Sequence, residues 1–101
     1  MAHRVAPEAE AELDEVWRYI ARESGSVETA RAVVSAITQR FYFLSAYPRI
    51  GRRRVDLRPG LRSYPADDYV VLYRIEGADV VIVHIFHGRR DIEGLVGRPS
   101  R

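Results

Sequence analysis

The stretch VVIVHIFHGRRD at residues 80–91 decides how the rest of the chain is interpreted. Apart from one histidine, its first seven residues are apolar, and most are β-branched, which predicts a buried strand over residues 80–86. The polar cluster HGRRD follows at once, at residues 87–91. Charged groups at the end of an apolar strand face water while a rigid element holds them. We therefore expect a binding or catalytic rim where this strand ends.

Two further strands precede this one. The sequence YVVLYRI at residues 69–75 and the sequence LRSY at residues 61–64 both favour extended backbone. The polar residues 76–79 suit a four-residue hairpin connection, and residues 65–68 suit a loop between the first two strands. Together these segments predict a three-stranded antiparallel sheet.

Two amphipathic helices are predicted before the strands. Pro7 suits the first turn of a helix, and apolar residues then recur at helical spacing, which predicts a helix over residues 7–23. The sequence SGS at 24–26 interrupts the pattern, and Ser26 is placed to cap a second helix. Apolar steps of three and four continue over residues 27–44, and a Tyr-Pro pair at 47–48 ends them.

The order of elements predicts an α+β fold with two layers. Residues 3–5 read as a short opening strand, so the chain runs β-αα-βββ and a helical hairpin covers the sheet. We expect one domain over residues 1–93 and a loose C-terminal tail over residues 94–101. The first ten residues contain no apolar run typical of a signal peptide, and we expect a cytoplasmic protein.

Charge is distributed unevenly along the 101 residues, although the formal net charge is only +2. Residues 1–28 carry seven acidic and three basic side chains, whereas residues 49–62 carry six arginines and one aspartate. All 16 basic residues are arginine, so every cation is a planar group that holds a carboxylate or phosphate with two bonds. The absence of cysteine excludes disulfides, thiolate zinc sites and a cysteine nucleophile.

The arginine-rich loop predicted at residues 49–58 has three interpretations. It is a solvated face, a nucleic-acid contact with Tyr47, Tyr64 and Tyr69 as stacking groups, or a dock for an acidic protein segment. Composition does not rank the last two. On the helices, we expect Tyr19, or one of Tyr42 and Phe43, to protrude toward a partner.

Two histidines near the end of the last strand have the spacing i, i+3. Because a strand repeats every two residues, His84 and His87 are expected on opposite faces, and we expect no metal site and no cofactor. His84 is expected to be packed or hydrogen-bonded within the sheet region. The cluster at 87–91 either moves a proton and holds a phosphate, or simply pairs with its neighbours and ends the strand.

The ordered set of motifs resembles the ParE/RelE superfamily of small toxins from bacterial toxin–antitoxin pairs. The matching segments are PEA at 7–9, VWRYIA at 16–21, Phe41, Leu44 and Pro48, GR at 51–52, DLRPGLRS at 56–63, YVVLYR at 69–74 and HGRRD at 87–91. The resemblance also implies the β-αα-βββ fold. The ending HGRRD is similar to the ParE branch.

The resemblance implies three possible functions. A ParE-like toxin poisons DNA gyrase without catalysis of its own, and its target contacts would be His87, Arg89, Arg90, Arg62 and Arg58. A RelE-like toxin would cut messenger RNA on the ribosome, with a catalytic set of Arg62, Arg74, His87 and Arg89. The third possibility is an inactive relative that only binds its antitoxin.

The resemblance also implies a ParD-like antitoxin with an acidic C-terminal segment. We expect its contacts on the helical hairpin and the arginine segment, at Leu13, Trp17, Tyr19, Ile20, Tyr42, Arg52, Arg53 and Arg54. Contact with DNA is expected only indirectly, through the antitoxin or gyrase.

Overall fold

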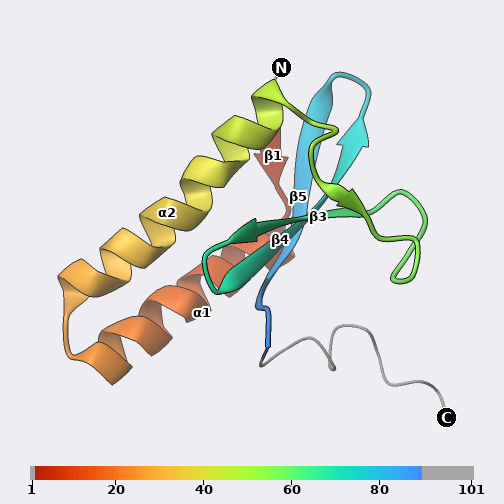
Figure 1. Cartoon of the computed structure of the whole chain (residues 1–101). Helices are drawn as coiled ribbons and strands as arrows, with labels where there is room; N and C mark the ends of the chain where they lie inside the picture. The colour runs from red at the N-terminus through yellow and green to blue at the C-terminus, as the bar shows by residue number, and fades with distance from the viewer. Residues whose placement is uncertain (1, 90–101) are drawn as a thin grey trace, which may run out of the picture.

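A computed structural model describes residues 2–89 of the chain, and Figure 1 shows the arrangement of its elements. These elements are β1 (His3–Val5), α1 (Pro7–Ser24), α2 (Val27–Ala46), β2 (Arg52–Arg53), β3 (Arg62–Ala66), β4 (Tyr69–Glu76) and β5 (Asp79–His87). The predicted order is confirmed, with one short strand added in the arginine segment. Arg90 and the tail predicted at 94–101 lie outside the described residues.

The strands form one sheet of five, in the order β1-β5-β4-β3-β2. Its centre is the predicted antiparallel set, in which β4 pairs with β3 on one side and with β5 on the other. Two short strands extend it, so the sheet has five strands instead of the three expected. β1 runs parallel to β5, and β2 pairs with β3 through only two residues, which is too short to leave a periodic signal.

The turn between β3 and β4 is tighter than predicted. Residues 65–66, expected in a loop, continue β3, and only Asp67 and Asp68 connect the two strands. Asp67 adopts a left-handed backbone with φ of +58°, which an aspartate tolerates. Pro65 fits the strand because β2 pairs only with Arg62 and Ser63, so no neighbour needs the missing N–H.

The helices begin and end close to the predicted residues because their capping signals operate. Gly25 ends α1 in a left-handed conformation with φ of +69°. The Ser26 hydroxyl accepts a hydrogen bond from the backbone N–H of Thr29 at 3.1 Å, which confirms the predicted cap of α2. Ala6 occupies the N-cap position of α1 and supplies no side-chain hydrogen bond.

Two apolar clusters lie on opposite faces of the sheet. The larger cluster joins the helices to one face and includes Phe41, Leu44, Tyr73 and Ile82. The smaller cluster consists of Leu61, Leu72 and Phe86 with partly buried neighbours, and it lies on the other face. Figure 1 shows the α1–α2 hairpin on one side of the molecule and the loop between β2 and β3 on the other.

An irregularity in β5 explains its long apolar run. The pairing changes from Tyr73 with Ile82 to Leu72 with His84, so Val83 is an extra residue in β5. Because of this bulge, Ile82 and Ile85 both join the cluster on the helix side. Neither of the two helices, which both lie within residues 2–89, has the length and apolarity needed to cross a membrane.

Candidate functional site

The last residues of β5 form the rim at the end of the sheet. His87 lies opposite Tyr69 of β4, and their rings meet edge to face with centroids 5.3 Å apart. The backbone N–H of Gly88 donates to the carbonyl of Asp68 at 2.9 Å as the chain leaves the strand. Contacts with β4 therefore fix this rim on the sheet.

The imidazole of His87 is oriented by its own backbone. Its Nδ1 atom accepts a hydrogen bond from the N–H of Arg89 at 3.2 Å. Accepting this bond uses the lone pair on Nδ1, so the neutral ring carries its proton on Nε2. The side chain of Arg89 is exposed beside it.

Helix α1 covers part of the edge of β5 that β1 leaves open. β1 pairs only with Val80, Val81 and Ile82. Beyond them, the Oε1 atom of Glu12 accepts the backbone N–H of Ile85 at 2.7 Å. An unpaired strand edge is a template for other strands, and this carboxylate occupies one of its donors.

Glu12 also binds His84, and this contact was not predicted. Its Oε2 atom lies 3.0 Å from Nδ1 of His84. The position of Glu12 early in the predicted helix over residues 7–23 gives no sign of this contact. Because Glu12 and His84 are 72 residues apart in the sequence, their contact cannot be predicted from local spacing. The predicted hydrogen bonding of His84 within the sheet region is confirmed.

The predicted orientation of the two histidines is also confirmed. His84 pairs with Leu72, which belongs to the smaller cluster, whereas His87 pairs with Tyr69, which belongs to the cluster on the helix side. The two rings thus belong to opposite faces. No group of three metal-ligating side chains occurs within residues 2–89.

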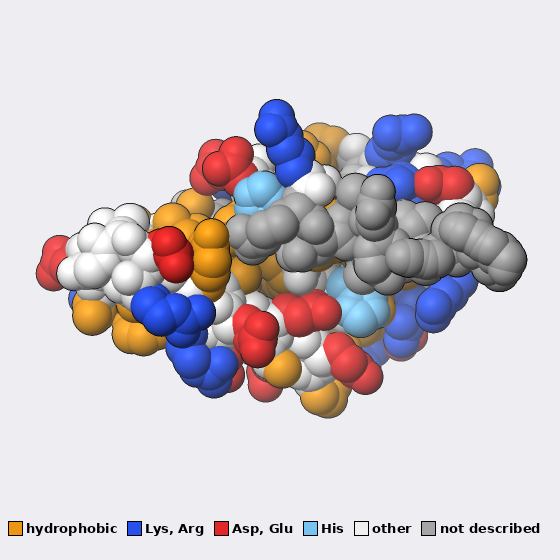
Figure 2. All heavy atoms as spheres, turned by 90° about the horizontal axis from the view of Figure 1, so that it is seen from below, with side chains coloured by type: hydrophobic (Ala, Val, Ile, Leu, Met, Phe, Trp, Pro, Cys, Tyr) orange, Lys and Arg blue, Asp and Glu red, His pale blue; other side chains and the backbone are white. Residues whose placement is uncertain are grey.

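A groove of about 330 Å³ runs between α1 and the end of β5. Its lining mixes carboxylates, guanidinium groups and apolar side chains, which are Glu12, Glu15, Val16, Arg18, Tyr19, Arg22, Tyr69, Ile85 and Phe86. Tyr19 is 37% exposed beside it. Figure 2 views this end of the molecule from below, and charged side chains of both signs are interleaved there with hydrophobic ones. This amphipathic groove suits a polypeptide better than a small apolar ligand.

The start of the arginine segment is anchored to the centre of the sheet. The hydroxyl of Tyr73 donates to the carbonyl of Pro48 at 2.7 Å and accepts from the N–H of Gly51 at 2.9 Å. Burial raises the pKa of the Tyr73 phenol, so this hydroxyl stays protonated. Nearby, one guanidinium nitrogen of Arg62 donates to the carbonyls of Arg49 and Gly51, at 3.2 and 2.9 Å.

The arginines at 52–54 point in different directions. Arg52 pairs with Ser63 and Arg53 with Arg62, so these adjacent residues belong to opposite faces of the sheet. Arg54 forms two hydrogen bonds to Asp56, at 3.0 and 2.9 Å. The Arg54 guanidinium thereby holds the pKa of the Asp56 carboxyl below its usual range. Arg54 is consequently less available to a partner than its neighbours.

The residues expected to bind an antitoxin do not form one surface. Leu13 and Ile20 are partly buried against the core, and Trp17 is also only partly exposed. Tyr19 borders the groove, whereas Tyr42 is 69% exposed on α2 and meets the ring of His3. Arg52, Arg53 and Arg54 lie beside the β2–β3 loop, far from the α1–α2 turn in Figure 1.

The four residues of the alternative nuclease site are not brought together. Arg62 aligns across the sheet with Tyr73, whereas His87 aligns with Tyr69 and Ala66. Four residues along a strand correspond to about 13 Å, so Arg62 and His87 are well beyond the reach of one phosphate. Arg89 lies two residues beyond His87, after the end of β5. The predicted gyrase contacts are separated too, because His87 and Arg89 lie at the end of β5, whereas Arg58 and Arg62 lie in the β2–β3 loop and at the start of β3.

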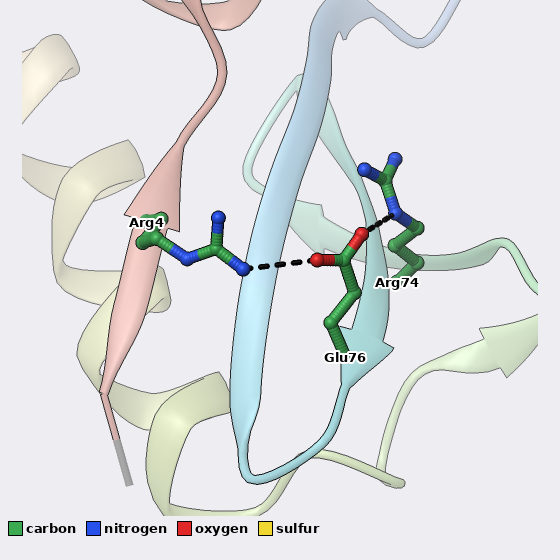
Figure 3. Close-up of polar contacts among 3 residues, drawn as sticks. All are labelled: Arg4, Arg74 and Glu76. Carbon is green, nitrogen blue, oxygen red and sulfur yellow. Dashed lines mark hydrogen bonds and ion pairs between the residues drawn. The ribbon is translucent and has the colours of Figure 1, made fainter.

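Arg74 is engaged elsewhere. Figure 3 shows Glu76 between two guanidinium groups, with Arg74 at 2.5 Å and Arg4 of β1 at 2.9 Å. These hydrogen bonds, from Arg74 and then Arg4, hold the pKa of the Glu76 carboxyl below its usual range. This triad links β1 to β4 across β5, so we assign it a structural role.

The sequence matches known toxins along most of its length. Residues 4–92 match the family model described as the ParE toxin of the type II toxin–antitoxin system parDE. The chain is 44% identical to Toxin ParE3 of Caulobacter vibrioides over 89 residues, which cover 88% of each chain. It is 30% identical to Toxin ParE1 of Mycobacterium tuberculosis, over 88% of this chain and 91% of that relative.

Solved structures share the fold. A chain of the chromosomal ParDE system from P. aeruginosa superposes with a TM-score of 0.76 at 22% identity, covering 86% of this chain and 95% of the other. A chain of the RelBE2 toxin–antitoxin complex from Mycobacterium tuberculosis gives a TM-score of 0.54 at 28% identity, covering 85% and 95%. A helical hairpin on a mixed sheet with a basic rim thus defines a small toxin of the RelE/ParE class. Within that class, the chain belongs to the ParE family of type II toxins.

Proposed function

We propose that this toxin inhibits DNA gyrase in the cytoplasm and that a ParD-like antitoxin with an acidic C-terminal segment neutralises it. Membership of the ParE family over residues 4–92 supports this function over ribonuclease activity. The proposed target contacts are His87 and Arg89 at the end of β5, Arg58 and Arg62 at the β2–β3 loop, and Arg90, which lies outside the described residues.

The separation of Arg62, Arg74 and His87 is the observation that favours target binding over RNA cleavage. Acid–base cleavage of a phosphodiester needs a proton donor, a proton acceptor and an anion-stabilising group around the same atoms. Arg74 is instead held by Glu76, and Arg62 lies at least about 13 Å along the sheet from His87. Such an arrangement suits a toxin that acts by contact.

The groove between α1 and β5 is the proposed antitoxin site. It offers a strand edge, the exposed ring of Tyr19, and the guanidinium groups of Arg18 and Arg22. An acidic, partly apolar segment complements these groups. Arg52 and Arg53 of β2, with Arg54 beside them, would make a separate, second contact with the antitoxin.

The gyrase proposal is tested with purified toxin, bacterial gyrase, ATP and supercoiled plasmid. We expect linear plasmid that accumulates only when both gyrase and toxin are present, and that disappears when the antitoxin is added. The absence of linear plasmid at saturating toxin would contradict gyrase poisoning. Translating ribosomes with a labelled message then separate the two remaining functions, because only a ribonuclease cuts the message.

The antitoxin proposal is tested by amide hydrogen exchange. Binding of the antitoxin should protect amides of α1 and of the end of β5. The Tyr19→Ala variant should bind the antitoxin at least about fivefold more weakly, because exposed aromatic residues often dominate such interfaces. Unchanged exchange in α1 on binding would place the antitoxin elsewhere.

A further inference from the structure

A hollow of about 380 Å³ opens beside β2 on the surface that links α2 to the sheet. Three guanidinium groups line it, and no carboxylate does; the full lining is Arg49, Arg53, Val55, Gly60, Leu61, Arg62 and Ile75. Like charges gathered without a counter-ion repel one another, and an anion between them relieves that repulsion. The neighbouring Arg54–Asp56 pair does not supply it, because Asp56 already accepts two bonds from Arg54.

The three arginines differ in how firmly they are held. Arg62 is fixed by the carbonyls of Arg49 and Gly51, which leaves its other guanidinium nitrogens without a hydrogen bond among the described residues. Neither Arg49 nor Arg53 has an ion pair or side-chain hydrogen bond within residues 2–89, and both are exposed. One cation is thus preorganised and two remain available, as bidentate phosphate recognition requires.

Aromatic rings continue the same surface. Tyr64 follows Arg62 by two residues on β3, so both side chains lie on one face, about 7 Å apart. The ring of Phe43 contacts the rings of Tyr47 and Tyr64, with centroids 5.1 and 5.7 Å apart. Tyr47 is 58% exposed, so its ring is accessible to a ligand.

We infer that this arginine hollow and its aromatic neighbours bind the phosphodiester backbone of DNA directly. Planar cations follow the phosphates, and exposed rings stack on bases that leave the helix, which is the combination found in single-strand binding grooves. A purely acidic polypeptide would use the cations but not the rings, whereas single-stranded DNA uses both. The inference departs from the expectation that DNA is contacted only indirectly, and it applies to the free toxin whether or not gyrase is its target.

The test measures fluorescence anisotropy of labelled single-stranded and duplex oligonucleotides with the purified toxin. Three phosphate contacts predict a loss of about 20- to 40-fold in affinity between about 50 and 200 mM salt. Arg53→Gln should weaken binding and lower the salt exponent by about one. Tyr47→Ala should weaken binding of single-stranded DNA by at least about fivefold and affect the duplex less.

The matched control is Arg31→Gln, which removes another exposed arginine, on α2. Circular dichroism checks that each variant is folded. The inference is overturned if the wild-type toxin binds neither oligonucleotide at low salt, or if Arg31→Gln weakens binding as much as Arg53→Gln. It is also overturned if Arg53→Gln weakens binding of a polyglutamate peptide but not of DNA, which would make the surface a protein dock. The anisotropy measurement contains no gyrase, so it tests DNA binding alone. A negative plasmid cleavage assay would contradict gyrase poisoning without affecting the DNA-binding result.

Discussion

The hydroxyl of Tyr73 lies 2.9 Å from the backbone nitrogen of Gly51, and this contact joins the central strand β4 to the arginine segment. The same hydroxyl donates to the carbonyl of Pro48, so a single buried group satisfies two backbone atoms after α2. The approach is so close that a Cβ atom at position 51 would lie 2.3 Å from the Tyr73 oxygen. Close approach, and not backbone freedom, therefore requires glycine here.

Both ends of this contact are sensitive to substitution. Gly51→Ala should lower the free energy of unfolding by about 1–3 kcal/mol because the added methyl group overpacks the site. Tyr73→Phe should cost about 1–3 kcal/mol because two buried backbone groups lose their partner. Urea unfolding measures both changes. Tyr64→Phe is the control, since no hydrogen bond of the Tyr64 hydroxyl occurs within the described chain, and an equal loss there would contradict the explanation.

Glu12 should protect the edge of β5. Glu12→Ala removes the acceptor of the Ile85 N–H, so exchange of that amide should accelerate by about fivefold, equivalent to about 1 kcal/mol for one hydrogen bond. Glu12→Gln retains an acceptor oxygen and should restore most of the protection. Exchange followed by NMR measures the amide, with Glu10→Ala as the control. Unaltered Ile85 exchange in Glu12→Ala would mean that another group protects the edge.

The Arg4–Glu76–Arg74 triad predicts a loss of stability in acid. The pKa of Glu76 is lowered from its ordinary value of 4.5, so its contribution is complete above that value and disappears as the pH falls through the lowered pKa. Glu76→Gln should therefore flatten the acid limb of the stability curve, and high salt should weaken the triad in the wild type. Urea midpoints measured from neutral to acidic pH test this. A curve for Glu76→Gln that parallels the wild type would show that the triad contributes nothing.

The N-terminus of α1 can be strengthened. Ala6 has the extended backbone of an N-cap residue, with φ of −65° and ψ of 152°, but no side-chain acceptor. Ala6→Ser should raise the free energy of unfolding by about 0.5–2 kcal/mol. Thermal unfolding measures the gain, and Ala6→Val, which adds side-chain volume but no acceptor, should not reproduce it. A similar rise for both variants would point to packing instead of capping.

The rim at the end of β5 distinguishes contact from catalysis. If His87 and Arg89 act by contact, Arg89→Glu should abolish most toxicity, whereas His87→Gln should be tolerated because glutamine keeps the size and hydrogen bonding of the ring. If His87 transfers a proton, His87→Ala and His87→Gln should both abolish toxicity. Growth after induced expression measures the effect, with antitoxin binding as the folding control. Full toxicity of all three variants would remove this rim from the function.

The sequence predicted those features that depend on local patterns. The apolar period placed both helices, the Ser26 cap was correct, and the alternation of the strands placed the antiparallel centre of the sheet. Strand β1 pairs with a strand nearly 80 residues away, so the sequence predicted it without its pairing. Strand β2 has only two residues, which is too short for a periodic pattern, so it was missed. The same limit applies to the site. The contacts of Glu12 with His84 and Ile85, and of Tyr73 with Gly51, depend on tertiary folding, which no spacing rule encodes.

The parallel pairing of β1 with β5 has a consequence for synthesis. β5 lies between β1 and β4 in the sheet, yet it begins only at Asp79, so the first strand waits for nearly the whole chain before it gains its partner. At about 5–20 residues per second, that wait lasts several seconds on the ribosome. During this time the apolar faces of α1 and α2 have no completed sheet to cover. Both helices are therefore available to a binding partner before the rim at the end of β5 exists.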